Sequence, residues 1–183
     1  MDALAELTAE KGYEATKISD IVRRAGVARK TLYDNFEGKE EVFLGAFDAA
    51  RDEMLSRVRQ GGEEAGEDWR DRIEAGLAAF LDYVAEQPTL ARMCMIEALS
   101  ATPTTTKRYE EALETFVEMA RKTLPADGHL PDTIAETAVG GVAWIVYQQI
   151  RRGEAERAED LLPELTEFML APYGAKEGVD GRG

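Results

Sequence analysis

The chain has 183 residues, 44% of them hydrophobic, and a formal net charge of −14. This length is sufficient for a small head domain and a larger helical core, but no apolar run is long enough to cross a membrane. A single Cys and an acidic stretch from Met1 to Glu10 argue against a secreted, disulfide-bonded protein, so we expect a cytoplasmic one with no membrane partner.

The hydrophobic pattern is helical throughout, without the alternation that is typical of strands. It predicts three short helices, then a long helix from Lys39 to about Gln60, with Gly61-Gly62 and the acidic residues up to Asp68 as a linker. The three short helices are expected at residues 2–11, 18–25 and 28–35.

Five further helices are expected in the rest of the chain, separated by Pro- and Gly-containing turns. They cover residues 69–86, a run from Pro88 to about Leu99, a run from Pro103, residues 133–151 and residues 158–170, with a loop at 125–131. The fold class is therefore all-α, with an N-terminal three-helix headpiece at 1–47 that contains a helix-turn-helix and a six-helix body at 48–173. Residues 174–183 are expected to be a disordered tail.

The segment from Ala15 to Phe47 is the most informative part of the sequence. Gly26 separates two short helices at a position where a positive φ is easily adopted only by Gly. Thr16 is expected to cap the first of them, and Val27 to be a buried pivot. The predicted inward-facing residues are Ile18, Ile21, Val22, Ala25, Leu32 and Phe36.

This pattern leaves Arg29, Lys30 and Tyr33 on an exposed face of the second short helix. Two cations and a phenol on one face suit contacts with phosphates and base edges in a DNA groove. Residues 11–43 hold seven Lys or Arg and six acidic residues, so the acidic excess lies in the rest of the chain.

The same segment resembles the DNA-binding domain of the TetR family of transcriptional regulators. The resemblance implies that Thr16, Thr31, Tyr33 and Lys39 contact phosphates and that Arg29, Lys30 and Thr31 lie nearest the bases. Asn35 is a further candidate for DNA contact, although Asp34-Asn35 stands where that family often has His-His. Ala28 stands where that family usually has a capping Ser, and the basic arm that precedes the first helix is not seen. The matching positions are Gly12-Tyr13, Thr16, Ile18, Asp20-Ile21, Arg24-Ala25-Gly26-Val27, Thr31-Leu32-Tyr33, Phe36 and Lys39-Glu40.

The resemblance implies a homodimeric transcriptional regulator that binds a palindromic operator in double-stranded DNA. We expect a repressor that a small apolar or aromatic effector releases from DNA. One alternative is a small-molecule sensor that acts through a protein partner and keeps a vestigial head. Another is a protein that organises DNA without regulating a promoter.

Large apolar side chains on the body helices are candidates for an effector pocket, although ordinary helix packing is the alternative for each of them. Polar contacts inside the pocket are expected from Tyr83, Tyr147, Arg92 and Gln148. The candidate pocket residues are Phe80, Tyr83, Met93, Met95, Phe116, Met119, Trp144 and Tyr147.

The last two helices are the candidate dimer interface, because two such hairpins would form a four-helix bundle. Gly140-Gly141, in the middle of the first of these helices, predicts a close approach either by a neighbouring helix, which we favour, or by a ligand. The alternative is that both stripes pack only within one chain. The candidate interface residues are Val139, Val142, Val146, Ile150, Leu162, Leu165 and Met169.

Nothing in the sequence suggests catalysis. His129 is the only His and falls in a predicted loop, which argues against a His-based metal site or a catalytic triad. Cys94 is expected to be a buried, inert thiol, with a redox sensor as the alternative. We therefore expect no enzyme activity, no cofactor and no metal.

Overall fold

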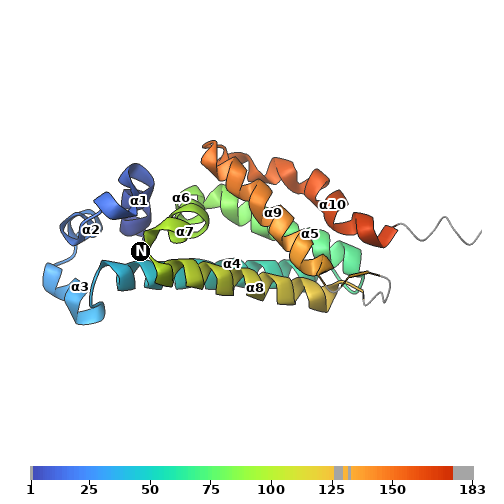
Figure 1. The fold of residues 1–183 in the computed structure, drawn as a ribbon, viewed down its shortest axis with the longest axis horizontal. Helices are drawn as coiled ribbons and strands as arrows, with labels where there is room; N and C mark the ends of the chain where they lie inside the picture. The colour runs from blue at the N-terminus through green and yellow to red at the C-terminus, as the bar shows by residue number, and fades with distance from the viewer. Residues whose placement is uncertain (1, 126–129, 132, 175–183) are drawn as a thin grey trace, which may run out of the picture.

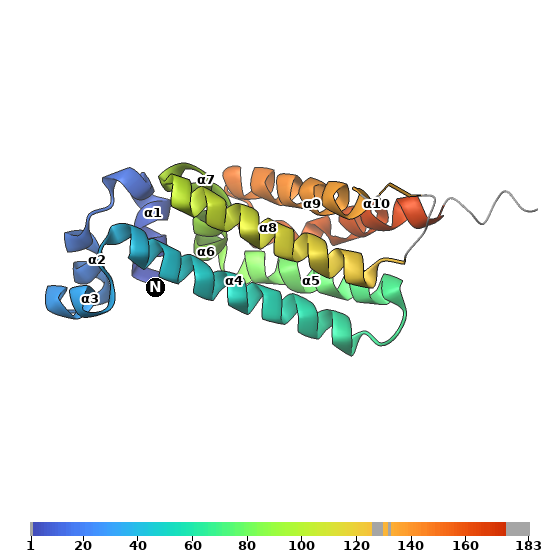
Figure 2. The ribbon, with the colours of Figure 1, turned by 60° about the horizontal axis from the view of Figure 1, so that its bottom comes forward.

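The computed structural model describes residues 2–125, 130–131 and 133–174, and these residues form helices and turns without a strand. Three short helices lie at one end of an elongated molecule, and the longer helices run lengthwise from them (Figure 1). Figure 2 shows that α4, α5, α8 and α9 share this lengthwise direction. No helix in the described part is long and apolar enough to cross a membrane. The predicted all-α fold class is confirmed.

The head consists of α1 (Asp2–Ala15), α2 (Ile18–Ala25) and α3 (Arg29–Asn35). Its first helix continues past the predicted end, with a kink at Gly12 where φ is 80°. Gly26 ends α2 with a φ of 66°, in the left-handed conformation that the sequence predicted.

The predicted cap of α2 is wrong by one residue. Lys17 is the N-cap, and the Asp20 carboxylate accepts a hydrogen bond of 3.3 Å from its backbone N–H. Thr16 is only 1% exposed, and its hydroxyl donates a bond of 2.9 Å to the Gly12 carbonyl. Thr16 thus fixes the connection between α1 and α2.

The buried face of the helix-turn-helix is narrower than predicted. Ile21 and Leu32 are buried, and Phe36 packs partly buried against them. Val27 is 43% exposed, so it is not the buried pivot that was predicted, and Ala25, predicted to face inward, is also exposed. Both residues flank Gly26 at the turn, where the chain is exposed to solvent.

The body begins with α4 (Lys39–Glu64) and α5 (Trp69–Glu86). The predicted helix from Pro88 to about Leu99 is present with a π-helical turn in its middle. A short 3-10 helix precedes the last helix, which begins later than predicted. The remaining elements are α6 (Pro88–Arg92), the π turn η1 (Met93–Glu97), α7 (Ala98–Ala101), α8 (Pro103–Thr123), α9 (Ile134–Arg151), the 3-10 helix η2 (Ala155–Leu161) and α10 (Leu162–Gly174).

The predicted linker at Gly61-Gly62 is wrong, because α4 continues through both glycines to Glu64. A Cβ at Gly61 would lie 3.0 Å from the Ala75 carbonyl oxygen, and one at Gly62 would lie 3.3 Å from the Arg72 carbonyl oxygen. The two glycines therefore allow α4 and α5 to approach closely, and they do not end the helix.

The head and the body share hydrophobic packing. The cluster around Leu4, Phe43 and Phe47 also contains Met93 and Ala98, which belong to the body. A second cluster joins α5, α8, α9 and α10. The predicted loop position of His129 and the predicted disorder of residues 175–183 fall outside the described residues, whereas Gly174, predicted to begin the tail, ends α10.

Candidate functional site

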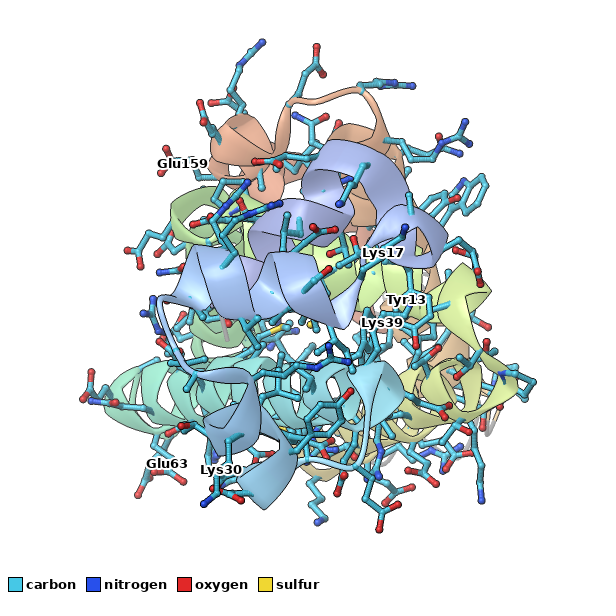
Figure 3. All side chains as sticks on the ribbon, turned by 90° about the vertical axis from the view of Figure 1, so that its left-hand side faces the viewer. Tyr13, Lys17, Lys30, Lys39, Glu63 and Glu159 are labelled. Atoms are coloured by element: carbon cyan, nitrogen blue, oxygen red, sulfur yellow. The ribbon has the colours of Figure 1, made fainter. Side chains whose placement is uncertain are left out.

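The exposed face of α3 is the first part of the candidate site. Helix α3 lies at the extreme tip of the head, and Lys30 points outward from it in the end-on view of Figure 3. Arg29 donates a hydrogen bond of 3.3 Å to the Tyr33 hydroxyl, and its guanidinium lies 5.5 Å from the centre of the Tyr33 ring. Thr31 and Asn35 are exposed too, with Asn35 donating a bond of 2.8 Å to the Thr31 carbonyl.

The other cations of the head are largely neutralised by acidic neighbours. Arg24 pairs with Glu6 at 2.8 Å and with Glu10 at 2.9 Å, and Lys11 pairs with Asp20 at 2.5 Å. Within the described part of the chain, no ion pair involves Arg29 or Lys30. Arg29 and Lys30 therefore leave uncompensated positive charge on α3, and Lys17 and Lys39 likewise form no ion pair within the described residues.

Lys39, which the resemblance implies as a phosphate contact, has partners within the head. Its ammonium donates a hydrogen bond of 2.9 Å to the Tyr13 carbonyl and lies 3.9 Å from the centre of the Tyr13 ring. Figure 3 shows the two side chains next to each other, with Lys30 farther out. In this structure Lys39 connects α4 to α1.

The second part of the candidate site is a cavity of about 380 Å³ between α4, α5 and α8. Its volume falls in the range of small-molecule sites in proteins. Most of the lining is apolar. The lining residues are Phe47, Arg51, Met54, Val58, Arg59, Gly62, Glu63, Arg72, Ile73, Gly76, Leu77, Phe80, Cys94, Met95, Tyr109, Ala112, Leu113, Phe116, Met119, Ala120, Lys122, Thr123, Val139, Val142, Ala143 and Met169.

The cavity is polar at the end that lies away from the head. Arg59, Arg72 and Lys122 line this end, together with Glu63. The buried Nε of Arg72 has no hydrogen-bond partner among the described residues. A buried donor without a partner is costly, so this end is suited to a ligand that carries an acceptor or a negative charge.

Four of the eight predicted pocket residues line the cavity, namely Phe80, Met95, Phe116 and Met119. The other four do not. Tyr83 and Met93 are fully buried in the packing around the cavity, whereas Trp144 is 58% exposed and stacks on Tyr147 at 5.5 Å. The expected polar contacts from Arg92 and Gln148 are also absent from the lining of the cavity described above.

The sequence did not single out the basic residues of the cavity. Arg72 directly precedes Ile73 in the apolar stripe of α5, and Gly76 follows one turn later. The sequence signal for this site was the position of Arg72, one turn before Gly76 and next to the apolar face of α5. A cation is unusual at such a position in ordinary helix packing.

The predicted dimer stripes lie mostly inside the chain's own core. Val146 is 0% exposed, and Val142, Ile150, Leu165 and Met169 are also buried, while Val139 and Leu162 are partly buried. The exposed large apolar residues of α9 and α10 are Trp144, Ile145 and Phe168. Helix α9 is apolar on more than one face, so its periodicity did not identify the face that packs within the chain.

Gly141 confirms the predicted close approach on α9, whereas Gly140 does not. A Cβ at Gly141 would lie 2.9 Å from Cε1 of Phe168 on α10, but one at Gly140 would have no neighbour within 4 Å among the described atoms.

Cys94 is buried at the cavity wall, as the sequence predicted. Burial raises the pKa of the Cys94 thiol to about 12, so the thiol stays protonated near neutral pH.

The chain combines a helix-turn-helix at one end with a helical body that contains an apolar cavity. This combination defines a class of DNA-binding folds with an internal ligand site. Within that class, residues 1–46 match the family model described as "Bacterial regulatory proteins, tetR family". The predicted resemblance to the TetR family is thereby confirmed over residues 1–46, the part of the chain that the family model matches.

Three relatives illustrate the similarity. The HTH-type transcriptional activator FasR of Mycolicibacterium smegmatis is 33% identical over 82 residues, which cover 45% of this chain and 37% of that protein. The matched segments span less than two thirds of the curated relatives' length. The fold matches FadR, a fatty acid degradation regulator from Bacillus halodurans, with a TM-score of 0.82 and 20% identity, covering 92% and 95% of the two chains. It also matches FadR from Bacillus subtilis in complex with stearoyl-CoA, with a TM-score of 0.77 and 18% identity, covering 93% and 95%.

Proposed function

We propose that this protein is a homodimeric DNA-binding transcriptional regulator controlled by a long-chain acyl effector with an anionic end. One observation carries the proposal: an apolar cavity with an arginine-lined end lies behind a helix-turn-helix whose exposed face holds Arg29 and Lys30. The proposal agrees with two of the similar proteins described above, a transcriptional activator and a fatty acid degradation regulator.

DNA recognition is assigned to α3. Its exposed Arg29, Lys30 and Thr31 are proposed to face the base edges, with Tyr33 and Asn35 toward the phosphates. Thr16 is left out of this surface because its hydroxyl is buried and bonded to Gly12. Lys39 is retained as a phosphate contact, because its ammonium has three donors and the bond to the Tyr13 carbonyl uses one of them.

The cavity fits an elongated effector better than a compact aromatic one. Phe47 and Gly62 both line it and are fifteen residues apart on α4, which corresponds to about 22 Å along the helix axis. A lining that extends this far along one helix suits an extended acyl chain better than a compact ring. Arg72, Arg59 and Lys122 would then bind the thioester and phosphate end of an acyl-CoA.

Dimerisation is assigned to the exposed face of α9 and α10. Trp144, Ile145 and Phe168 are 58%, 39% and 45% exposed, and large apolar side chains gathered on one face are typical of subunit interfaces. A two-fold axis through this face would place two heads on one palindromic operator, with half-site centres about 34–36 Å apart or a multiple of that distance.

We keep repression as the proposed direction of control. Binding of the effector then lowers the affinity for DNA, and binding of DNA lowers the affinity for the effector. Tighter DNA binding in the presence of the effector would reverse this coupling, and transcription measured with and without the protein distinguishes repression from activation, the role named for FasR. The alternative function is a sensor with a vestigial head that acts through a protein partner.

The proposal is tested by fluorescence anisotropy with the DNA upstream of the gene, over a salt series. We expect salt-dependent binding with two protomers per site, and a loss of binding in the double variant Arg29→Ala/Lys30→Ala. The matched control, Arg70→Ala/Arg121→Ala, removes the same charge at the opposite end of the body and should bind normally. Equal binding by both double variants would favour the vestigial-head alternative.

A further inference from the structure

Glu97 is the only charged side chain in the described part of the chain that is buried, with an exposed fraction of 8%. It ends the π turn η1, between the cavity and the head. Burying a carboxylate is costly unless specific donors compensate it. Its position therefore calls for an explanation beyond ordinary packing.

The donor that Glu97 finds belongs to the head. Oε2 of Glu97 accepts a hydrogen bond of 3.2 Å from the backbone N–H of Tyr13, eighty-four residues away in the sequence. The kink at Gly12, with φ of 80° and ψ of 162°, interrupts the hydrogen bonding of α1 immediately before Tyr13. Oε1 of Glu97 lies 3.7 Å from a guanidinium nitrogen of Arg92, which supplies a partial counter-charge.

Tyr13 is held from its other side by the first residue of α4. Its carbonyl accepts from Lys39 at 2.9 Å, and its ring packs edge-on against Phe43 with the ring centres 5.4 Å apart. The backbone of Tyr13, at the end of α1, is therefore connected to two other elements. Its N–H is bound by Glu97 of η1, and its carbonyl is bound by Lys39 of α4. Figure 3 shows Tyr13 and Lys39 together on the head side of the molecule.

The same five-residue turn also forms part of the cavity wall. Cys94 and Met95 line the cavity, while Met93 is 0% exposed in the cluster shared with the head. Cys94 and Met95 at the cavity wall and Glu97 at the head therefore belong to one turn. π turns inside helices are rare and frequently occur at functional sites, which agrees with this placement.

We infer that Glu97 is a positioning residue that sets the pose of the head through the Tyr13 N–H and makes η1 the element through which the cavity acts on the head. The second part rests on the proposed effector function. The first part, the control of head pose, is independent of any ligand or DNA.

Amide hydrogen exchange of the full chain tests both parts. Three variants are compared with the wild type: Glu97→Ala removes the acceptor, Glu97→Gln retains an oxygen at its place, and Glu110→Ala removes an exposed carboxylate of α8. We expect exchange at residues 12–17 to be at least tenfold faster in Glu97→Ala and within twofold of wild type in the other two. If Glu97→Ala does not fold, Glu97→Asp replaces it, because this change keeps the charge but withdraws the carboxylate by one methylene.

Stearoyl-CoA is the ligand used for the second comparison. In the wild type it should change exchange both at residues 72–80 of the cavity wall and at residues 12–17, and in Glu97→Ala only at 72–80. Unchanged exchange at 12–17 in Glu97→Ala, or an equal response to stearoyl-CoA there, would overturn the inference. If stearoyl-CoA leaves residues 72–80 unaffected even in the wild type, the acyl effector is wrong, and the comparison of unliganded variants alone decides the role of Glu97.

Discussion

Lys39 donates a hydrogen bond of 2.9 Å to the carbonyl of Tyr13 and also places its ammonium 3.9 Å from the centre of the Tyr13 ring. The pair joins the start of α4 to the end of α1, so it contributes to stability as well as to any contact with DNA. Replacing Lys39 by Met should lower the free energy of unfolding by about 1–2 kcal/mol, from the lost hydrogen bond and cation–π contact.

Urea denaturation measures this effect. Lys17→Met is the matched control, because Lys17 is exposed and forms no ion pair within the described chain, and it should change stability by less than about 0.5 kcal/mol. Equal stability of the two variants would show that the Lys39–Tyr13 contact does not hold the head together.

Two glycines should respond in opposite ways to substitution by Ala. At Gly61 the new Cβ would lie 3.0 Å from the Ala75 carbonyl oxygen, so Gly61→Ala should destabilise the protein by about 1–3 kcal/mol through separation of α4 and α5. At Gly140 the Cβ would meet nothing within 4 Å, so Gly140→Ala should stabilise α9 by about 0.5–1 kcal/mol. Thermal unfolding of both variants checks the signs, and a stabilised Gly61→Ala variant would contradict the close helix contact.

Arg72 is predicted to contribute most of the polar affinity for the effector. Its buried Nε has no partner among the described residues and lies at the basic end of the cavity. Arg72→Met should weaken stearoyl-CoA binding about tenfold, or about 1.4 kcal/mol. Isothermal titration calorimetry provides the measurement, and Arg70→Met, on an exposed position of the same helix, is the control. Equal affinity of the two variants would place the anionic end elsewhere.

Trp144 is predicted to lie in the dimer interface. Trp144→Glu would place an unpaired charge there, so it should yield monomers at micromolar concentration, measured by light scattering. Leu99→Glu is a matched control on α7, because Leu99 is 41% exposed and lies outside α9 and α10. A wild type that is itself monomeric, or a dimeric Trp144→Glu variant, would contradict the assignment.

Cys94 should be unreactive in the folded protein. Burial raises the pKa of its thiol to about 12, so little thiolate exists at pH 8. Ellman's reagent should modify Cys94 at least a hundredfold more slowly in buffer than in urea. A variant that carries Cys94→Ser together with Ser100→Cys moves the thiol to an exposed position of the same region and should react rapidly without urea. Rapid modification of native Cys94 would instead support the sensor alternative.

The head was largely predictable from sequence because its signals are local. Gly26 requires a left-handed turn, and Leu32 falls on the buried side of a helix whose other side holds Arg29 and Lys30. The error at Thr16 has a simple cause, because a hydroxyl before a helix can cap it or bond backward to the preceding turn, and the kink at Gly12 determines which occurs.

The body was predictable only as a set of helices. The pattern of α9 shows apolar residues on several faces, so Val146 could be placed in the core and Trp144 at the surface only once α10 and α5 were positioned around it. The Gly61-Gly62 pair has the composition of a linker, but its role depends on the distance to α5, which no local signal gives. The contact between Glu97 and Tyr13 depends on the tertiary fold in the same way.

The most direct test of the account is the coupling between the cavity and the head. DNA affinity is measured by anisotropy with and without saturating stearoyl-CoA, and stearoyl-CoA affinity by calorimetry with and without DNA. The account predicts that each ligand weakens the other by the same factor, at least tenfold, because binding linkage is reciprocal. Stearoyl-CoA bound in the cavity with no change in DNA affinity would contradict it.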